Sequence, residues 1–386
     1  MSQDDARRVR RRLEALLGTP ATEGNSVTVY RNGDEIFPAM LDAITGAERS
    51  VDLMTYVYWS GSIAHQFADA LAERAEAGVR VRVLIDAVGG SKIEDGLVDG
   101  MQRAGVDVQW FRRPLRKSPF KQNHRCHRKV LVVDEVTAFT GGVGIAEEWT
   151  GNARGPGEWR DTHLKVEGPV VDGVAAGFSQ NWAETDRPMY DERDRFPEHD
   201  AAGPAVVQAV RGSASIGWDD MQTLFHVAIG SATRRLRIAT AYFAPSHDFV
   251  DLLLDRASNG VQVQILLPGS GADKRVCQLA SESIYAELVD GGIEVWNFQP
   301  SMLHAKILTL DGVLSVVGSS NFNRRSMNHD EEIALAIVDA DVTATLDAHF
   351  DEDLKRSEPI DLERWRGRSG AQKALEQAVQ PVRRWL

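Results

Sequence analysis

A short pattern of chemically active side chains occurs twice in this chain, once in each half. Both copies have the form H-x-K-x4-D, and their members are His127, Lys129 and Asp134, then His304, Lys306 and Asp311. An imidazole can act as a nucleophile or as a general acid or base, and an ammonium group can hold an anion. One such match arises by chance in many proteins, whereas two in equivalent places indicate a paired catalytic site.

The spacing within each copy fits a β-strand, where residues two apart share a face. His127 would then point the same way as Lys129, and His304 the same way as Lys306. The apolar residues that follow each lysine extend that face into a core. Each histidine–lysine pair is therefore expected on one face of a strand.

Each of these strands is predicted to turn back as a hairpin. Asp311-Gly312 is a two-residue turn signal, and pairing outward from it sets His304 against Ser319. The same count around Asp134-Glu135 places Gly142 opposite His127. Small residues at this return point would let backbone and ligand approach closely.

The segments around the two patterns repeat one order of elements. We expect strand, helix and strand at residues 50–58, 63–77 and 79–85, and again at 236–243, 249–258 and 261–267. Gly78 and Gly260 stop the two helices. This repeat is that of a duplicated α/β domain rather than a solenoid. We expect a charged N-terminal helix within residues 1–26, lobes at 27–185 and 206–386, a linker at 186–205 and a C-terminal helix.

The overall charge limits the classes of partner. Of the 386 residues, 44 are Lys or Arg and 56 are Asp or Glu, which gives a net charge of −12. That balance argues against a general nucleic-acid binder. Between Phe111 and Lys129, however, eight residues are basic and none is acidic, and aromatic residues are interspersed. Both a solvated face and attraction of an anionic lipid surface or substrate fit this segment.

Two further interpretations concern the cellular compartment of the protein and the binding of a metal ion. Cys126 and Cys277 cannot build a disulfide framework, and no segment has the form of a signal peptide or an apolar membrane span. We therefore expect a cytoplasmic protein with an inert, buried Cys126. His124 with His127 could form a zinc pair, but the surrounding cations disfavour it. His163 is expected to support the site rather than act in it.

The doubled pattern resembles the signature of the phospholipase D superfamily, in which a G-[GS]-x-N segment follows, here Gly318-Ser319-Ser320-Asn321. Similarity to bacterial cardiolipin synthases and their soluble relatives runs from about Val27 to Ile337. It includes Tyr56-Val57-Tyr58-Trp59, Trp159-Arg160-Asp161-Thr162-His163, Asn181-Trp182, Tyr242-Phe243-Ala244-Pro245, Leu267-Pro268-Gly269 and Asn321-Phe322-Asn323-Arg324-Arg325-Ser326. The resemblance implies an α/β fold of two similar lobes, each a mixed β-sheet flanked by helices, related by pseudo-two-fold symmetry, with the active site between them.

The activity implied by this resemblance is phosphodiester cleavage or transfer through a covalent phosphohistidine, with no metal and no other cofactor. By resemblance, His127 is the nucleophile and His304 the general acid, and the reverse assignment stays open. Lys129 and Lys306 would hold the phosphate oxygens. The segment Gly318-Ser319-Ser320-Asn321, which follows the second hairpin, would add Asn321 and Ser319 to the residues that bind phosphate.

Each histidine also needs a carboxylate on its other ring nitrogen. The matching family positions are Asp161 for the first half and Glu332 for the second. Asp134 and Asp311 belong to the signature and are candidate catalytic residues, although their place at the turn favours a structural role. Gly144 departs from the family pattern, because many relatives have Asn there.

The favoured function is that of a phosphatidyltransferase of the cardiolipin-synthase type, acting on phosphatidylglycerol or a similar lipid. Alternatives are a phospholipase D with water as acceptor, a nuclease of the same superfamily and a non-catalytic membrane adaptor. The net charge disfavours the nuclease, and the intact patterns disfavour the adaptor. Since one chain supplies both half-sites, we expect a monomer that binds the inner face of the membrane peripherally. Near the C-terminus, Trp365, Arg366, Arg368, Arg383, Arg384 and Trp385 fit an interfacial patch or, preferably, a packed closing helix.

Overall fold

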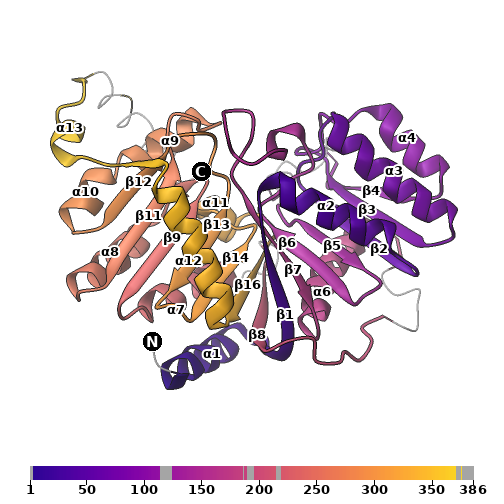
Figure 1. The fold of residues 1–386 in the computed structure, drawn as a ribbon, viewed down its shortest axis with the longest axis horizontal. Helices are drawn as coiled ribbons and strands as arrows, with labels where there is room; N and C mark the ends of the chain where they lie inside the picture. The colour runs from indigo at the N-terminus through magenta and orange to yellow at the C-terminus, as the bar shows by residue number, and fades with distance from the viewer. Residues whose placement is uncertain are drawn as a thin grey trace.

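The computed structural model describes residues 3–113, 124–185, 187–188, 195–213, 219–370 and 375, and within them the chain forms two similar α/β halves (Figure 1). The strands of the first half are β1 (Thr22–Arg31), β2 (Ser50–Thr55), β3 (Arg80–Asp86), β4 (Asp107–Phe111), β5 (Val130–Val133), β6 (Thr137–Gly141) and β7 (Thr162–Glu167). Those of the second are β8 (Ala205–Gly212), β9 (Arg235–Thr240), β11 (Gln262–Pro268), β12 (Glu294–Phe298), β13 (Lys306–Leu310), β14 (Leu314–Gly318), β16 (Glu332–Val338) and β17 (Ser357–Pro359). The short strands β10 (Phe243–Ala244) and β15 (Phe322–Asn323) form a separate parallel pair.

The long strands join into one 15-stranded sheet. Its order is β17-β12-β11-β9-β13-β14-β16-β8-β1-β7-β6-β5-β2-β3-β4. Apart from β17, each strand of one half has its counterpart at the same distance from the central β8–β1 pair. The expected α/β fold of two related lobes is thus confirmed, and the two lobe sheets are continuous with each other.

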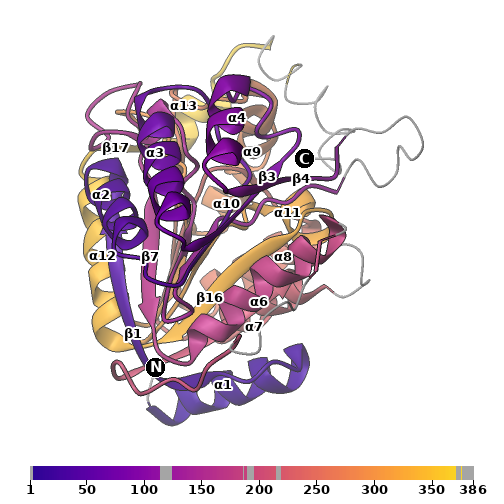
Figure 2. The same ribbon diagram turned by 90° about the vertical axis from the view of Figure 1, so that its right-hand side faces the viewer.

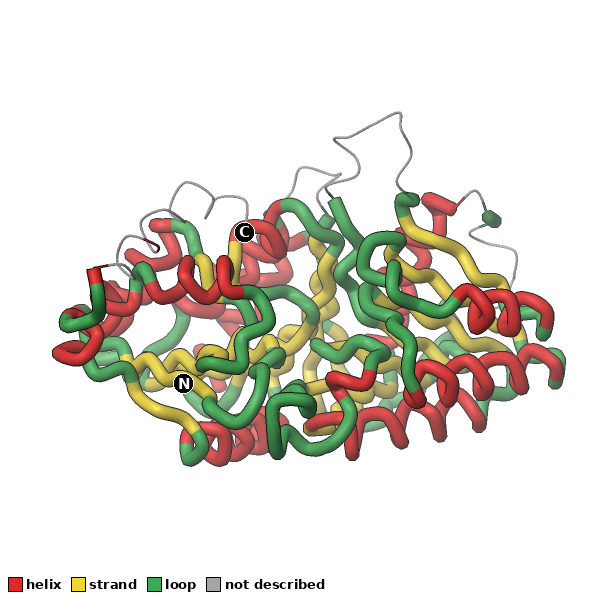
Figure 3. Tube along the Cα trace, turned by 90° about the horizontal axis from the view of Figure 1, so that it is seen from above, coloured by secondary structure: helices red, strands yellow, loops and turns green. Residues whose placement is uncertain are grey.

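Helices cover both faces of the sheet. They are α1 (Gln3–Leu17), α2 (Asn32–Thr45), α3 (Ser62–Glu76), α4 (Asp95–Arg103), α6 (Val170–Trp182), α7 (Asp220–Gly230), α8 (His247–Ser258), α9 (Arg275–Glu282), α10 (Tyr285–Asp290), α11 (Arg324–Asn328), α12 (Ala340–Leu354) and α13 (Leu362–Arg366). Figure 2 shows α2, α3 and α12 on one side of the sheet and α6, α7 and α8 on the other. Seen from above, the strands lie as a layer between the helices (Figure 3).

Most elements lie close to their predicted ranges, with informative differences at the ends. The strand expected at 50–58 ends at Thr55, because Tyr56 to Trp59 leave the sheet. Residues 22–26, expected outside the first lobe, already belong to β1. The N-terminal helix α1 buries Val9 and Leu13 in the core of the second half, against α7. No helix in the described ranges is both long and apolar enough to cross a membrane.

The two hairpins turn where predicted, but their register differs by one residue. The amide of Val313 donates to the carbonyl oxygen of Leu310, around left-handed Asp311 and Gly312. The ladder then resumes at Leu310↔Leu314, so Val313 is left out of it. The first hairpin behaves in the same way, with Val133↔Thr137 as its first pair. The predicted pairings of His304 with Ser319 and of His127 with Gly142 were therefore wrong by one residue.

Candidate active site

The two histidine–lysine segments lead into β5 and β13, which begin at Val130 and Lys306, and each segment is joined by backbone hydrogen bonds to the opposite half. The amide of His127 donates to the carbonyl oxygen of Glu331 at 2.9 Å. In the same manner, the amide of His304 donates to the carbonyl oxygen of Arg160 at 2.7 Å. Isolated parallel bridges at Cys126↔Glu331 and Arg160↔Leu303 mark these two contacts. The main chain itself therefore aligns the two half-sites.

The carboxylates that orient the histidines come from the opposite halves. Nδ1 of His127 lies 2.9 Å from Oε1 of Glu332, and Nδ1 of His304 lies 2.7 Å from Oδ2 of Asp161. The expectation that Asp161 serves the first half and Glu332 the second was wrong in this respect. The crossing follows from the backbone bridges, because each bridge sets a histidine beside the residue that precedes the other half's carboxylate.

Each carboxylate is held by a different kind of donor. The Ser319 hydroxyl donates to Oε2 of Glu332. On the other side, Nε1 of Trp149 donates to Oδ2 of Asp161 at 2.8 Å, and the Thr162 amide donates to Oδ1 at 2.8 Å. Ser319 was predicted to bind phosphate, but its hydroxyl is engaged with Glu332. This contact makes Ser319 a positioning residue.

The amide of Asn321 is also directed elsewhere. Its Nδ2 lies 3.4 Å from the hydroxyl of Ser326, and the buried Asn321 side chain is not among the residues that line the central cavity. The contacts of the described residues therefore give no support to a phosphate contact by Asn321 in this conformation.

The two lysines lie beside the histidines of their own halves. Nζ of Lys129 donates to the carbonyl oxygen of His127 at 2.7 Å. Nζ of Lys306 lies 2.9 and 3.1 Å from the ring nitrogens of His304 and also donates to the His304 carbonyl oxygen. Burial lowers the pKa of Lys129 to about 8 and that of Lys306 to about 7. Both lysines are thus cations that lose their protons near neutral pH.

Burial also determines the state of the histidines. It lowers the pKa of His127 to about 4 and that of His304 to about 3, and the nearby lysine charges act in the same direction. Burial alone would raise the pKa values of Asp161 and Glu332, but the paired histidines and the lysines hold both below their usual range. At neutral pH the arrangement is two neutral imidazoles held by two carboxylates.

Both histidines line a central cavity of about 250 Å³. Its walls contain Tyr56, Val57, Trp59, Val88, Gly89, Ser91, Lys92, His127, Lys129, Trp149, Trp159, Tyr242, Asp273, Lys274 and His304. Edge-to-face contacts place Tyr56 against His127 and Trp149 against His304, with ring centroids 5.2 and 5.0 Å apart. The cavity therefore combines His127, Lys129 and His304 with an aromatic wall, and Lys306 contacts His304 without being among the lining residues.

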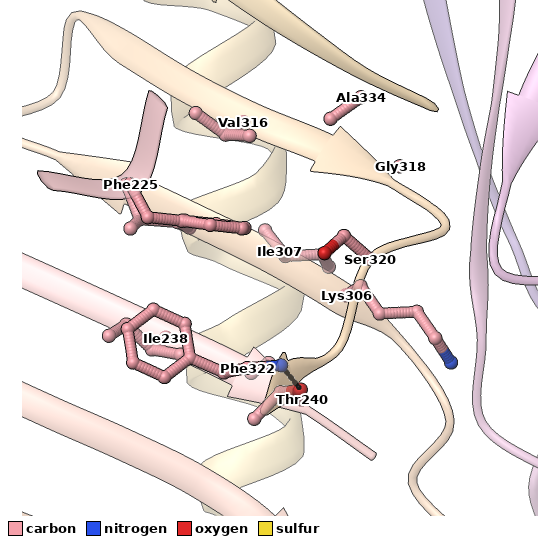
Figure 4. A pocket seen from close by; sticks show the side chains of 12 residues that line it. Phe225, Ile238, Thr240, Lys306, Ile307, Val316, Gly318, Ser320, Phe322 and Ala334 are labelled. Carbon is pink, nitrogen blue, oxygen red and sulfur yellow. Dashed lines mark hydrogen bonds between the residues drawn. The ribbon is translucent and has the colours of Figure 1, made fainter. Parts of the chain in front are cut away.

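A second, much smaller void lies behind Lys306 (Figure 4). Its volume is about 10 Å³, at the lower limit for a single water molecule. Most of its lining is apolar, and the amide of Phe322 donates to the hydroxyl of Thr240 at its edge, at 3.1 Å. Figure 4 shows the ammonium group of Lys306 directed away from this void, which therefore belongs to the packing that supports the lysine.

The glycine that departs from the family pattern has a steric explanation. A Cβ atom at Gly144 would lie 2.7 Å from Cβ of Val57 and 3.3 Å from Cη2 of Trp149. Trp149 thus occupies the space next to Gly144, and its indole N–H faces Asp161. The two half-sites differ in this respect, because an indole N–H holds Asp161 whereas a hydroxyl holds Glu332. Sequence reasoning missed Trp149, because no local pattern connects it to a histidine 155 residues away.

Asp134 and Asp311 lie at the far ends of the hairpins and do not line the cavity. The Asp134 carboxylate accepts hydrogen bonds from the amides of residues 48, 49 and 50. The Asp311 carboxylate accepts from the amides of residues 233, 234 and 235, as well as from the Thr233 hydroxyl. Asp311 itself donates its backbone amide to Arg235, and both aspartates have positive φ values. Their inclusion among catalytic candidates is corrected to a structural role at the turns.

The remaining candidates take supporting positions. Cys126 is buried, as expected, and burial raises the pKa of its thiol. His163 is buried beneath the site without lining the cavity, and burial lowers its pKa to about 4. His124 contacts the carbonyl oxygen of His329 through Nδ1, at 2.8 Å. In the part of the chain that is described, no three His, Cys, Asp or Glu side chains gather as a metal site would require.

Only part of the basic segment between Phe111 and Lys129 lies within the described residues. Residues 114–123 lie outside the described residues, and so do three of its cations. Of the others, Arg125 pairs with Asp86 and Arg112 pairs with Glu184. The fully buried Arg128 donates to the carbonyl oxygens of Gly177, Gly212 and Glu332. Arg128 thus connects the two halves next to His127, a contact that the sequence did not predict.

At the C-terminus, Trp365 packs against Tyr285, whereas Arg383, Arg384 and Trp385 lie outside the described residues.

Comparisons with known proteins agree with this architecture. The family model described as "Cardiolipin synthase, PLD-like domain" matches residues 40–152 and 226–354. Curated relatives include "Probable cardiolipin synthase YwiE" of Bacillus subtilis, which is 33% identical over 339 residues, covering 87% of this chain and 67% of the relative. The "Cardiolipin synthase" of Geobacillus thermodenitrificans is 32% identical over 351 residues, covering 89% and 68%.

Solved structures share the fold. A phosphatidylserine synthase from Haemophilus influenzae superposes with a TM-score of 0.76 at 15% identity, over 98% of this chain and 100% of that one. A polyphosphate kinase from Porphyromonas gingivalis gives a TM-score of 0.58 at 14% identity, over 94% and 54%. With the doubled signature, the paired lobes and the family match together, the chain belongs to the phospholipase D superfamily, in its cardiolipin synthase family, and is an enzyme that acts on phosphodiesters.

Proposed function

We propose that this enzyme is a phosphatidyltransferase of the cardiolipin-synthase type, which moves a phosphatidyl group from one phospholipid to a hydroxyl group of another. The observation that carries this proposal is the pair of carboxylate-held imidazoles that line one cavity together with Lys129, while Lys306 contacts the ring of His304. The names of the curated relatives support a phospholipid substrate. Phosphatidylglycerol or a similar anionic lipid is the proposed donor.

The proposed reaction begins with a neutral histidine. Because Nδ1 of each ring faces a carboxylate, Nε2 is the nitrogen that would react, and in His304 this atom also lies 3.1 Å from Nζ of Lys306. We assign His127 as the nucleophile, in keeping with the family resemblance. Its Nε2 lone pair forms a bond to phosphorus while the bond from phosphorus to the headgroup oxygen breaks. His304, as an imidazolium, gives its Nε2 proton to the leaving alkoxide.

The second half of the reaction reverses these roles. Neutral His304 takes the proton of the acceptor hydroxyl, whose oxygen attacks phosphorus as the bond to His127 breaks. Lys129 and Lys306 would stabilise the charge on the non-bridging oxygens, a task that a metal ion performs in many other phosphoryl-transfer sites. The phosphate charge would also offset the lysines that lower the pKa of His304. Substrate binding would thereby favour the protonated acid that the first step needs.

We further propose that the protein contacts an anionic membrane at the mouth of the cavity. Val88, which lines the cavity, is 45% exposed, and Val276, two residues from the lining residue Lys274, is 46% exposed. Exposed apolar residues next to lysines are suited to the surface of an anionic bilayer. Peripheral binding would let a lipid headgroup enter the cavity while its acyl chains stay in the membrane.

The test is to incubate the purified protein with phosphatidylglycerol vesicles and to analyse the lipids. A transferase yields cardiolipin, and a phospholipase D yields phosphatidic acid alone even at high lipid concentration. Mass spectrometry of the acid-sensitive adduct would identify the modified histidine peptide and the attached phosphatidyl group. If folded protein gives neither lipid product, the proposed function is wrong.

A further inference from the structure

Two lysines at the mouth of the cavity, Lys92 and Lys274, are separate from the pair beside the histidines. We propose that Lys92, seated on Trp59, forms a second phosphate-binding subsite, which takes the phosphodiester of the acceptor phospholipid. This inference rests on the proposed transferase function. It adds a reason why an anionic phospholipid, rather than water or a neutral alcohol, would be the preferred acceptor.

The first support is the electrostatic state of Lys92. Its ammonium group lies 3.9 Å from the centroid of the Trp59 ring, within the range of a cation–π contact. Among the described residues, no carboxylate forms an ion pair with it. Since Lys129 and Lys306 are assigned to the reacting phosphate, Lys92 is a cation that lines the cavity with Lys129 and remains for another anion.

The second support is that the loop carrying Lys92 is fixed in place. Nε1 of Trp59 donates to the carbonyl oxygen of Gly89 at 2.7 Å. The Ser60 hydroxyl and amide both donate to the carbonyl oxygen of Lys92, at 2.7 and 3.2 Å. Gly89 packs so closely that a Cβ atom there would lie 2.1 Å from the carbonyl oxygen of Tyr56. The backbone at Lys92 is therefore preorganised, which lowers the entropic cost of binding.

The third support is a direct connection between this loop and the His127 segment. Oδ1 of Asp86 accepts from the amides of Val88 and Gly89, at 2.9 and 3.1 Å. Oδ2 of the same carboxylate accepts from Nε of Arg125 at 3.0 Å and from the amide of Cys126 at 2.9 Å. One buried aspartate thus fixes the Lys92 loop relative to the residue before His127. The two phosphate positions would keep a constant separation.

The part of the cavity wall that the second half contributes has a different charge. Lys274 lies over Tyr242, with Nζ 5.0 Å from the ring centroid, but Asp273 lines the same wall. The Tyr242 hydroxyl contacts both oxygens of Asp273, at 2.8 and 2.9 Å. Among the described residues that line the cavity, the second half thus contributes one lysine and one aspartate, whereas the first half contributes Lys92 and Lys129 and no carboxylate. An acceptor phosphate would bind at Lys92.

The experiment is an internal competition between two acceptors. Vesicles of phosphatidylglycerol are supplied together with 1-butanol, and the ratio of cardiolipin to phosphatidylbutanol is measured. Both products arise from the same phosphatidyl-enzyme, so a change in membrane binding or in donor cleavage affects them equally. In Lys92→Gln, we expect this ratio to fall roughly tenfold, the effect of losing one charge-assisted contact. Added salt should lower the ratio more in the wild type than in the variant.

Two variants serve as matched controls, because each also removes one charge. Arg12→Gln lies on α1, away from the cavity, and should leave the ratio unchanged; Lys274→Gln should change it less than twofold. The inference is overturned if Lys92→Gln keeps the wild-type ratio, or if Lys274→Gln lowers it equally. If the wild type forms no product of either kind, the proposed function fails, a result distinct from an unchanged ratio in an active enzyme.

Discussion

Nδ1 of His127 lies 2.9 Å from Oε1 of Glu332, a residue of the opposite half of the molecule. The reciprocal contact joins His304 to Asp161 at 2.7 Å. Each imidazole is therefore oriented by a carboxylate that its own lobe does not supply. This crossing predicts which histidine responds to the loss of which carboxylate.

Glu332→Gln is expected to change the tautomer and pKa of His127 while leaving His304 as it is, because the amide has nearly the shape of the carboxylate but carries no charge. Asp161→Asn should do the reverse. Nitrogen NMR of protein labelled at histidine measures both rings in one sample. Turnover should fall in each variant by roughly 10³-fold or more, as when a histidine-orienting aspartate is replaced in a catalytic triad. A response of His304 to Glu332→Gln would contradict the crossed pairing.

The lysines should set an alkaline limit on activity. Burial lowers the pKa of Lys129 to about 8 and that of Lys306 to about 7, so both cations are lost as the pH rises through this range. A lysine must be charged to hold a phosphate oxygen. The imidazolium form of His304 already becomes rarer as the pH rises above about 3, where the pKa of His304 lies. We therefore expect kcat/KM, which reports the free enzyme, to fall with pH and to fall more steeply above about pH 7 to 8, where the lysine charges are also lost.

Lys306→Arg provides the control for this assignment. A guanidinium keeps its charge throughout the same range, so the steeper part of the decline should begin closer to the higher pKa of Lys129, even if the rate is lower at every pH. A wild-type profile whose slope does not steepen up to about pH 9 would show that the lysine charges are not limiting.

Replacement of Asp311 should affect stability far more than chemistry. In Asp311→Ala, three backbone amides and the Thr233 hydroxyl lose their acceptor, and alanine is poorly suited to the positive φ at this turn. We expect the free energy of unfolding to fall by about 2 kcal/mol or more. Denaturant unfolding measures the loss, and product formation per folded molecule should stay within a few-fold of wild type. A fully folded but inactive variant would return Asp311 to the catalytic set.

Restoring the family asparagine at position 144 should reduce activity. The side chain introduced by Gly144→Asn would collide with Val57 and displace Trp149, which donates to Asp161. The expected outcome is a lower rate and altered tryptophan fluorescence, with Gly144→Ala showing a milder form of both. Wild-type or higher activity in the Gly144→Asn variant would indicate that a phosphate donor can be accommodated there after all.

Local pattern was sufficient to predict the elements that carry the site. The turn residues located both hairpins, whereas His127, Lys129 and His304 lie just before the strands on which the period of two had placed them. The one-residue error in register arose because the sequence identifies a turn but not whether the next residue joins the ladder. Val313 and its counterpart Val136 have no feature that excludes them from pairing.

The local sequence pattern did not predict the contacts between distant segments. The pairing of Glu332 with His127 depends on backbone bridges between the halves, and Trp149 and Asp86 act through contacts formed only when distant segments pack. The local sequence around each carboxylate does not show which of the two histidines the carboxylate contacts. The doubled pattern therefore predicted the residues of the site better than the partners of each residue.

The crossed carboxylates also bear on how the protein is made. During synthesis, His127 emerges long before Glu332, which belongs to β16, and β16 pairs with β8 only after most of the second half has been translated. The first lobe on the ribosome thus has its histidine and lysine but lacks the carboxylate that orients the ring. A nascent chain that has exposed only this lobe would be unable to attack lipid headgroups. Catalytic activity would begin only when the second half has folded and Glu332 reaches His127.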